Sequence, residues 1–474
     1  MTSRLKAIFR YFLDVNREER LKVLFLTLTF FFVIGGYTVA KELKDSIFGA
    51  IVGVDYQPKA KMISMLVLIP AIFFYSRLVD LLRRHQLLYF YSILYSILGL
   101  FFAYFIGHPT IGLANTDSSP YRLFGWLFYF FIEGYTPFVV SVFWAFANSI
   151  TSPEAAKNNY TLMVSGSKLG GMLSTLFAWW LLSLKSLNRT PLETDVLNHQ
   201  ILIAYSSICL ILVPFIIGLL IKFVPRKSLH GYEAAYQIEK EKHEHPEKKE
   251  SAISSMFAGF ILLVKTPYVL GIFAIGVFYE LIYAVFNFER LIMGKQLATT
   301  TTEYSAFLFE QVFWTHLIGF FIVLLGVRPI INFLGERRSL LIVPIIVGLG
   351  LLMFMTSPTG AILYVFILIR SLNYAFTQPL RESLYTITVK DVQFKSKSWI
   401  DGFGTKFSKT CGSTFNDLTK GLTYSGHIVA NSILFTGTII FWLVTAFLLG
   451  KRFDKAIANN EVIGESHKVH VEKN

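Results

Sequence analysis

Basic side chains stand inside stretches of sequence that are otherwise apolar, and they have the chemistry to bind an anion. Arg370 follows the run Ile367-Leu-Ile, and Arg381 comes eleven residues later, about three helical turns further along the same face. Lys44 lies in the other half of the chain. Guanidinium groups bind phosphate oxygens in bidentate fashion, so these three cations predict a path for a polyanionic solute rather than a sugar.

Carboxylates in the same apolar stretches could offset those cations. Glu133 lies 15 residues before Asn148, which at 1.5 Å per residue places it roughly 22 Å from the end of its span. Asp45, Glu280 and Glu310 are further candidates. Such groups carry protons in gradient-driven carriers and serve equally as counter-ions, so the sequence leaves their role open between coupling and counter-charge.

Two structural explanations compete with substrate binding. Arg370 could pair with Glu133 or Glu280 as a bridge between the two halves of the chain. The charges from Lys41 to Asp45 could instead form an ion-pair cluster on the surface. An ionisable group near the bilayer centre costs at least about 2.5 to 3.5 kcal/mol on insertion scales, so one that enters the membrane must face a cavity or a partner.

The elements that must position these side chains are long apolar stretches. A spanning helix needs about 20 mostly apolar residues. Hydrophobic residues make up 54% of the 474 residues and the mean hydropathy is +0.53, far too apolar for a soluble protein of this length. We therefore expect an all-α membrane protein with twelve transmembrane helices, near 22–41, 62–79, 86–107, 123–147, 160–184, 201–224, 258–286, 304–326, 339–357, 360–380, 399–418 and 428–450.

A polar interruption divides the chain into two halves. The charge run Glu239–Glu250 predicts a cytoplasmic linker over 225–257, between six-helix bundles at 22–224 and 258–450. Residues 1–21 read as a cytoplasmic amphipathic arm, and 451–474 as a polar tail without apolar periodicity, which indicates disorder.

The two halves repeat each other at matching places, which predicts two pseudo-symmetric bundles in a major-facilitator fold. Short charged loops follow the second and eighth apolar stretches, and we expect them to act as gates or locks: Asp80, Arg83 and Arg84, and Glu336, Arg337 and Arg338. The run Phe143-Trp-Ala-Phe-Ala-Asn148 ends the fourth stretch as Asn373-Tyr-Ala-Phe-Thr-Gln378 ends the tenth, and we expect Asn148 and Asn373 to contact substrate.

The distribution of charged residues along the chain indicates the orientation of the protein in the membrane and the partners it can have. Lys and Arg gather before the first span, in the linker and after the last span, which predicts cytoplasmic N- and C-termini. The net charge of +13 would suggest nucleic acid in a soluble chain, but these residues are spread between spans, so no nucleic-acid partner is expected. His243 and His245 lack metal-ligand spacing, and Ser165–Gly171 fails the spacing of a phosphate-binding loop. We expect no metal, no cofactor and no enzymatic activity.

Several stretches resemble the ATP/ADP translocase family of obligate intracellular bacteria and plastids, and the likeness spans most of the chain. Leu43-Lys44-Asp45-Ser46 looks like the family's first-helix motif, and Phe143-Trp144 with Phe146-Ala147-Asn148 is similar to its fourth-helix ending. The most specific agreement comprises Arg370, Tyr374, Pro379, Arg381, Glu382, Lys395, Lys397, Ile400-Asp401, Gly404, Lys406, Lys409 and Gly412-Ser413.

The resemblance implies a nucleotide transporter in which four charged residues serve transport. They are a first-helix lysine, a fourth-helix glutamate, a seventh-helix glutamate and a tenth-helix basic residue. Lys44, Glu133 and Arg381 match three of these, whereas Phe286 or Asn287 stands where the seventh-helix glutamate is expected.

We therefore expect a monomeric secondary transporter that moves ATP, ADP or a related nucleotide across a bacterial inner membrane by alternating access, as an exchanger or a proton symporter. A major-facilitator carrier of another organic anion or cofactor is the alternative, because one fold hosts many substrates. A transport-inactive scaffold or receptor is a third interpretation, which the insertion cost of buried charges argues against.

Overall fold

The computed structural model describes residues 17–151, 153–184, 189–229, 260–325, 327–356, 358–377, 380–381, 384–388, 392, 396, 399–459, 461 and 463–464. These residues are mostly helical, and the one isolated β-bridge among them joins Thr388 to Ile463 without forming a strand. The predicted all-α class is confirmed. Most of the predicted arm and linker lies outside the described residues.

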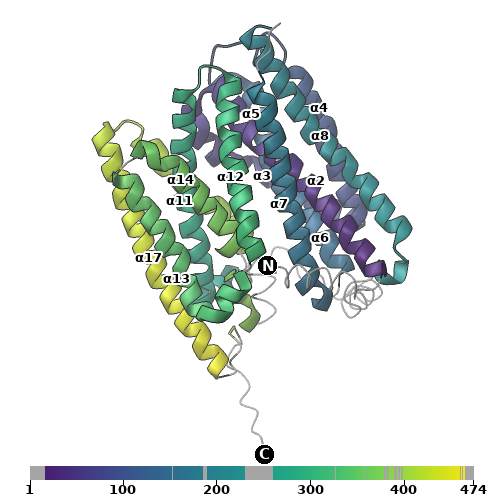
Figure 1. Ribbon diagram of the computed structural model, residues 1–474, viewed down its shortest axis with the longest axis vertical. Coiled ribbons are helices and arrows are strands. Elements are labelled where there is room, and N and C mark those ends of the chain that lie inside the picture. Colours follow the sequence, from purple (N-terminus) through teal and green to yellow (C-terminus); the bar gives the residue numbers. More distant parts are fainter. Residues whose placement is uncertain are drawn as a thin grey trace, which may run out of the picture. The chain divides into compact units, whose positions relative to one another are not determined.

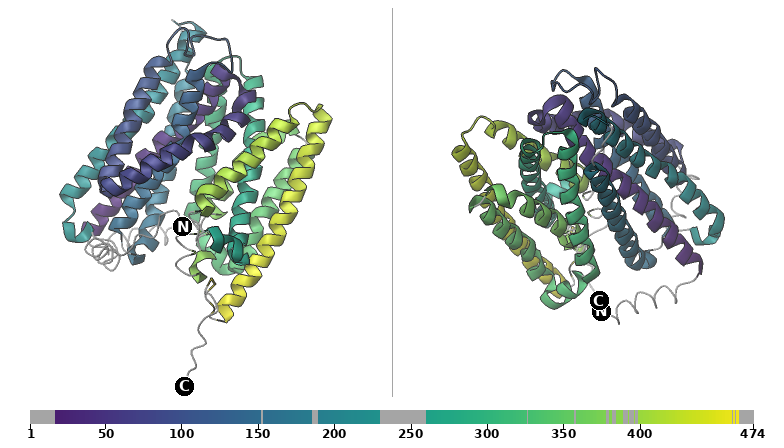
Figure 2. Two further views of the ribbon diagram at one scale, coloured as in Figure 1. Left: turned by 180° about the vertical axis from the view of Figure 1, so that it is seen from behind. Right: turned by 45° about the horizontal axis from the view of Figure 1, so that its top comes forward.

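The chain forms two compact units, each built of helices that run side by side (Figures 1 and 2). Unit 1 comprises Met1–Gln57, Leu66–Glu247 and Gly294–Leu317. Unit 2 comprises Pro58–Met65, Lys248–Met293 and Ile318–Asn474. The predicted bundle boundaries at 22–224 and 258–450 stay a prediction.

The described helices of unit 1 come mainly from the first half of the chain. They are α2 (Arg17–Phe48), α3 (Gln57–Leu81), α4 (Arg84–Phe105), α5 (Leu123–Glu133), α6 (Ser141–Ile150), α7 (Pro153–Ser183) and α8 (Pro191–Phe223), with π-helical turns η1 (Gly49–Gly53) and η3 (Thr136–Val140). Most of α12 (Thr301–Leu325) also belongs to this unit, whereas the Pro58–Met65 part of α3 belongs to unit 2.

The described helices of unit 2 come mainly from the second half. They are α11 (Pro267–Leu297), α13 (Val327–Thr356), α14 (Pro358–Leu372), α16 (Thr405–Thr419) and α17 (Tyr424–Ala458), with π-helical turns η5 (Asn373–Thr377) and η8 (Trp399–Gly404). The backbone of α13 bends at Gly335, whose φ of 75° is a conformation that only glycine adopts readily. The predicted loop at 328–338 is therefore helical on both sides of this bend, and not an open connection.

Local signals fix where several helices begin. Pro153, Pro191, Pro267 and Pro358 each occupy the first position of a helix, where the missing N–H costs nothing. At α8 the Thr190 hydroxyl also accepts a hydrogen bond from the Glu193 N–H, and the Glu193 carboxylate accepts one from the Thr190 N–H.

Small residues let α2 and α7 pack closely. A Cβ atom added at Gly170 would lie 2.3 Å from the Phe31 carbonyl oxygen, and one at Gly166 would lie 2.4 Å from the Thr27 side chain. A Cβ at Gly35 would lie 2.6 Å from the Ser174 hydroxyl. The glycine-rich run Ser165–Gly171 thus serves close helix packing, as small residues do in membrane proteins.

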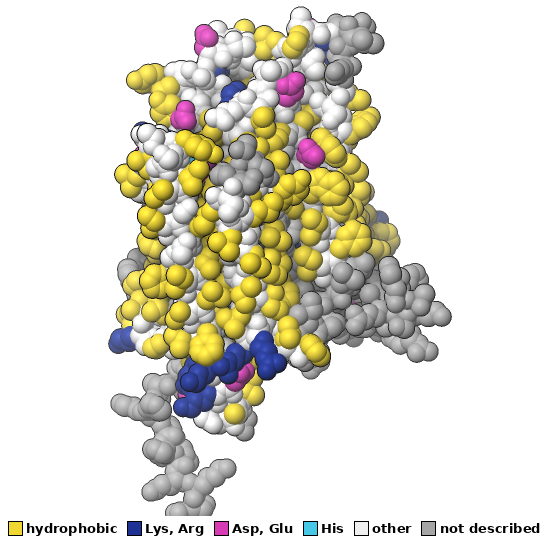
Figure 3. Space-filling view, turned by 60° about the vertical axis from the view of Figure 1, so that its left-hand side comes forward, with side chains coloured by type: hydrophobic (Ala, Val, Ile, Leu, Met, Phe, Trp, Pro, Cys, Tyr) yellow, Lys and Arg dark blue, Asp and Glu magenta, His cyan; other side chains and the backbone are white. Residues whose placement is uncertain are grey.

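Apolar side chains cover much of the surface. Eight of the described helical segments are long and apolar enough to cross a membrane, with large exposed residues such as Tyr104, Phe215 and Phe441. Figure 3 shows one face on which a broad hydrophobic area ends in a cluster of Lys and Arg. Neither α14, with 15 residues, nor the polar α16 is among the eight, so the predicted count of twelve spans stays a prediction.

The last helix continues beyond the predicted end of the second bundle. The helix α17 ends at Ala458 rather than near Gly450, so disorder from residue 451 was a wrong prediction for 451–458. Beyond it the Ile463 N–H donates to the Ile387 carbonyl at 2.8 Å, and Ile463 is buried. The first part of the tail thus packs against the segment that follows the tenth apolar stretch.

Candidate functional site

Lys44 and Glu133 form a buried ion pair in unit 1. The Lys44 Nζ atom, on α2, lies 2.6 Å from Glu133 Oε1 at the end of α5 and 3.4 Å from Asp45 Oδ1. The same Nζ lies 4.3 Å from the centre of the Tyr129 ring. The structure therefore brings together three predicted site residues, two from the end of α2 and one from the fourth apolar stretch.

The groups around this pair are buried. Lys44 and Asp45 are each 3% exposed, and Tyr129 is fully buried. The Gln57 side-chain amide donates to Asp45 Oδ1 at 2.8 Å, which orients this carboxylate. A surface cluster is therefore the wrong interpretation for Lys44 and Asp45, because charges with so little water around them depend on one another.

In unit 2, Arg381 and Glu280 from the predicted set each belong to an ion pair. Arg381 Nη2 lies 2.7 Å from Asp401 Oδ1, and Lys409 Nζ lies 3.7 Å from Glu280 Oε2. These side chains are 19% to 40% exposed, more than Lys44. A Cβ atom added at Gly276 would lie 3.3 Å from Arg381 Nη1, so Arg381 lies against α11. Asp401 and Lys409 were quoted for the family resemblance but not predicted as site residues.

Arg370 is 3% exposed and shares an aromatic neighbour with Arg290, a residue outside the predicted site. The Arg290 guanidinium lies 4.2 Å from the centre of the Phe366 ring, and that of Arg370 lies 5.7 Å from the same centre. Arg290 is fully buried and donates to Asn287 Oδ1 at 3.0 Å. A basic residue shortly after an apolar run was the available signal, but Arg290 lies outside the predicted span at 258–286.

π-Helical turns follow two of these charges at the same distance. The turn η3 begins three residues after Glu133, and η5 begins three residues after Arg370. A π-turn inserts an extra residue into the helical repeat and is frequent at functional sites. The fourth and tenth apolar stretches thus share a local feature that residue spacing did not predict.

The remaining predicted residues are less closely grouped. Asn373 is half-buried and begins η5, and Glu310 is half-buried on α12. At the first predicted gate, the Arg83 N–H donates to the Gln86 side chain at the start of α4. At the second, the Arg337 guanidinium lies 4.8 Å from the Phe447 ring centre, and Arg338 is exposed. The side chains of Asp80, Arg84, Asn148 and Glu336 lie outside the described residues.

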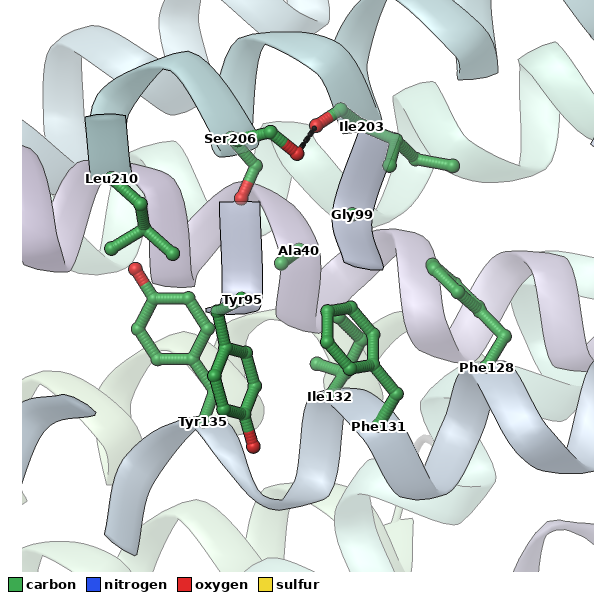
Figure 4. Close-up of a pocket in the computed structure, with 11 residues that line it drawn as sticks. Ala40, Tyr95, Gly99, Phe128, Phe131, Ile132, Tyr135, Ile203, Ser206 and Leu210 are labelled. Atoms are coloured by element: carbon green, nitrogen blue, oxygen red, sulfur yellow. Dashed lines mark hydrogen bonds between the residues drawn. The ribbon is translucent and has the colours of Figure 1, made fainter. Parts of the chain in front are cut away.

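A small cavity lies near the Lys44 pair in unit 1. Its lining includes Ala40, one turn before Lys44, and the aromatic rings of Tyr95, Phe131 and Tyr135, which Figure 4 shows facing the same space. The volume is ≈ 10 Å³, about enough for one water molecule. This cavity cannot hold an organic anion, so in this conformation it is a packing feature.

The basic side chains of these pairs can exchange a carboxylate partner for another anion. Lys44, Arg381 and Lys409 each have a carboxylate within 3.7 Å. A phosphate oxygen offers the same charge-assisted hydrogen bonds as a carboxylate oxygen. Each cation can therefore pass between an internal partner and an anionic solute, and the empty site keeps no isolated charge at these positions.

Comparison with known proteins agrees with this chemistry. The model of the TLC ATP/ADP transporter family matches residues 121–362. "ADP,ATP carrier protein 1" of Chlamydia muridarum (strain MoPn / Nigg) is 24% identical, covering 94% of this chain and 91% of its own length. "ADP,ATP carrier protein 4" of Rickettsia felis is 25% identical and covers 96% of both chains.

A solved structure supports the same fold. A proton:xylose symporter of the major facilitator superfamily superposes with a TM-score of 0.56 at 14% identity, covering 94% of this chain and 98% of its own. The predicted major-facilitator fold is confirmed, and the chain is a multi-pass membrane protein. The family match spans more than half of the sequence, and the chain therefore belongs to the TLC ATP/ADP transporter family.

Proposed function

We propose that this transporter exchanges nucleotides, ATP against ADP or a close relative, across a bacterial inner membrane by alternating access. It acts as a monomer with both termini in the cytoplasm and has no nucleic-acid partner. Lys44, Arg370, Arg381 and Lys409 bind phosphate groups, and Glu133, Asp401 and Glu280 replace the phosphates at Lys44, Arg381 and Lys409 when the substrate leaves. Family membership supports the substrate class, and the buried Lys44–Glu133 pair and the partly exposed Arg381–Asp401 pair support the mechanism.

The observation that carries the proposal is the Lys44–Glu133 pair. A lysine that is 3% exposed has its Nζ 2.6 Å from a carboxylate from a different helix. Such a pair is expensive to desolvate and contributes little net stability, so a purely structural origin is a weak explanation for it. In a chain whose relatives are named carriers of ADP and ATP, it is better explained by substrate chemistry.

Alternating access sets a limit on how strongly these cations bind. The substrate must bind on one side and leave on the other, so its phosphates cannot be held by uncompensated charge. The carboxylate partners meet this condition, because each one competes with phosphate for its cation. Binding then depends on the difference between two charge-assisted interactions rather than on the full strength of one.

The orientation in the membrane is supported by exposed basic residues at the ends of the predicted apolar spans. Arg83, Lys222, Arg338 and Lys451 are exposed, and each lies at or just beyond the end of such a span. In bacterial membranes, short loops rich in Lys and Arg stay in the cytoplasm. Reactivity of single cysteines introduced at Arg338 and at Asp117 toward a membrane-impermeant reagent tests this, since only the Asp117 position is expected to react in intact cells.

Uptake of radiolabelled ATP by intact bacterial cells that express the protein tests the function. We expect saturable uptake that unlabelled ADP inhibits, that an uncoupler leaves unchanged, and that the Arg381→Ala variant loses. Lys222→Gln is the matched control, because it removes an exposed basic charge at the end of α8. If protein present in the membrane takes up another organic anion in a saturable way but takes up no ATP, the substrate is that anion and not a nucleotide.

A further inference from the structure

The exposed face of α17 changes from apolar to basic near the end of the helix. Residues spaced three or four apart share one face of a helix. One such face of α17 is exposed, and its side chains are Ile440, Val444, Phe447, Lys451 and Lys455. The opposite face is buried in unit 2 and includes Trp442, Ala446, Leu449, Phe453 and Ala456. The two lysines therefore continue the surface that the exposed apolar residues form.

Two arginines of α13 lie beside this end of α17. A Cβ atom added at Gly450 would lie 2.8 Å from the Arg337 Cα atom, so Arg337 packs against α17 one residue before the first of these lysines. The Arg337 guanidinium lies 4.8 Å from the centre of the exposed Phe447 ring, and the next residue, Arg338, is exposed. Figure 3 shows Lys and Arg side chains gathered at the edge of a broad hydrophobic area. We call Arg337, Arg338, Lys451 and Lys455 the basic patch.

We infer that the basic patch binds the headgroup of an anionic phospholipid, whose acyl chains lie along the exposed apolar face of α17. The patch shares no residue with the ion pairs that serve transport. The inference therefore concerns a second ligand of the protein and does not depend on which solute is carried.

The length of α17 places the two lysines at the level of lipid headgroups. The helix has 35 residues, which at 1.5 Å per residue is a length of roughly 52 Å. The hydrocarbon core of a bilayer is about 30 Å thick, so several turns of α17 must extend beyond it. Lys451 and Lys455 lie in the last two turns. A lysine there can pack its aliphatic part against acyl chains while its ammonium group contacts phosphate.

The charge of the basic patch favours an anionic headgroup over a zwitterionic one. The neighbouring Arg452 forms an ion pair with Glu461, but in the described part of the chain no carboxylate is within ion-pair distance of Arg338, Lys451 or Lys455. The four cations of the patch have one exposed carboxylate, Asp454, beside them on α17. Clustered Lys and Arg at a membrane surface attract anionic lipids. Basic residues that serve only to orient the chain would show no preference among lipids.

Native mass spectrometry of the purified full-length protein in mild detergent tests the inference. The protein is mixed with equal amounts of phosphatidylglycerol and phosphatidylcholine that have the same acyl chains, and the lipids it retains are counted. We expect the wild type to retain mainly phosphatidylglycerol. The ratio of retained phosphatidylglycerol to phosphatidylcholine should fall about fivefold for each cation removed, in Lys451→Gln and in Lys451→Gln/Lys455→Gln. Lys451→Arg/Lys455→Arg keeps both charges and should keep the ratio.

Lys222→Gln is the matched control, because it removes an exposed cation at the end of α8 in unit 1 and should leave the ratio unchanged. All the substituted side chains are exposed, and equal thermal unfolding midpoints would verify that the variants are folded. Equal retention of the two lipids by the wild type, or the same ratio in Lys451→Gln and Lys222→Gln, would overturn the inference. Inorganic phosphate at the lipid concentration should displace no phosphatidylglycerol, and displacement would show a site for free phosphate instead of lipid.

Discussion

Lys44 has two carboxylate oxygens within 3.4 Å of its ammonium group, and this crowding defines its role at the level of single residues. If all three side chains are ionised, the group of Lys44, Asp45 and Glu133 has a net charge of −1. We expect a phosphate that approaches Lys44 to displace Glu133 rather than Asp45. The Glu133 side chain is 18% exposed, whereas Asp45 accepts a hydrogen bond from Gln57. Glu133 is therefore the partner expected to move during transport.

Replacement of Glu133 by Gln tests this assignment. The amide cannot balance the Lys44 charge when the site is empty, so we expect kcat for nucleotide exchange to fall by about tenfold or more. Nucleotide binding should be retained, because Lys44 keeps its charge. Asp454→Asn, at an exposed position near the end of α17, is the control. Normal kcat in Glu133→Gln would show that this carboxylate takes no part in the transport cycle.

Replacement of Asp401 by Asn tests the competition between carboxylate and phosphate through KM. This carboxylate competes with substrate for Arg381 through a 2.7 Å contact, and a partly exposed pair of this kind contributes about 0.2 to 1 kcal/mol. Asp401→Asn should therefore lower KM for ATP by about two- to fivefold and lower kcat as well, since release becomes slower. Initial rates over a range of ATP concentrations measure both. A raised KM would mean that Asp401 positions Arg381 and does not compete.

The sequence indicated some of these residues and not others, for physical reasons. Lys44 and Glu133 stood out because a charge within a long apolar run needs a partner or a cavity. Arg290 did not, because it lies beyond residue 286, the predicted end of the seventh span. Its burial results from packing against Phe366 on α14, and no local pattern reports a contact between residues 76 positions apart.

Helix packing determines how precisely the site residues are held, and α2 shows this at the level of elements. Lys44 lies on the same helix as Thr27, Phe31 and Gly35, which contact the small residues of α7. Close approach of two helices through glycine gives many van der Waals contacts in a medium without a hydrophobic driving force between helices. The position of Lys44 thus depends on glycines several turns away.

Gly170→Ala is expected to destabilise unit 1. Its new Cβ would lie 2.3 Å from the Phe31 carbonyl oxygen, on a backbone atom that cannot turn aside. Overpacking of this kind costs about 1 to 3 kcal/mol. Gly437→Ala on α17 is the matched control, because nothing lies within 4 Å of its new Cβ. Thermal unfolding in detergent should show a lower midpoint for Gly170→Ala alone, and equal midpoints would argue against tight packing of α2 on α7.

The C-terminal segment supplies a second prediction for the elements. Ile463 is 4% exposed in the core of unit 2, and its N–H donates to the Ile387 carbonyl. Ile463→Asp places a charge there and should reduce the stability of unit 2 by about 2 to 4 kcal/mol. Asn459→Asp adds the same charge at an exposed site and serves as the control. An unchanged unfolding midpoint in Ile463→Asp would show that this segment does not pack in solution.

Element positions could be predicted from hydropathy more reliably than element geometry. Each of the twelve predicted stretches overlaps a described helical segment, because lipid requires long apolar helices. The π-turns at Thr136–Val140 and Asn373–Thr377 were not predicted, since they arise where packing forces one extra residue into a turn. The bend at Gly335 in α13 was likewise read as part of a loop.

At the scale of the whole molecule, each ion pair described here lies within one unit. Lys44–Glu133 belongs to unit 1, and Arg381–Asp401 and Lys409–Glu280 belong to unit 2. Carriers of this fold work by movement of one half relative to the other. Pairs confined to one unit can persist through such a movement, so the binding groups of each unit remain compensated while access to the substrate changes sides.

Counter-transport in proteoliposomes decides whether this protein exchanges nucleotides. The purified protein is reconstituted into vesicles loaded with ADP or left empty, and entry of radiolabelled ATP is measured with and without an imposed pH gradient. We predict rapid entry only into vesicles that contain ADP, with one ADP released for each ATP that enters and no dependence on the gradient. ATP entry into empty vesicles driven by the pH gradient would contradict exchange and establish proton symport.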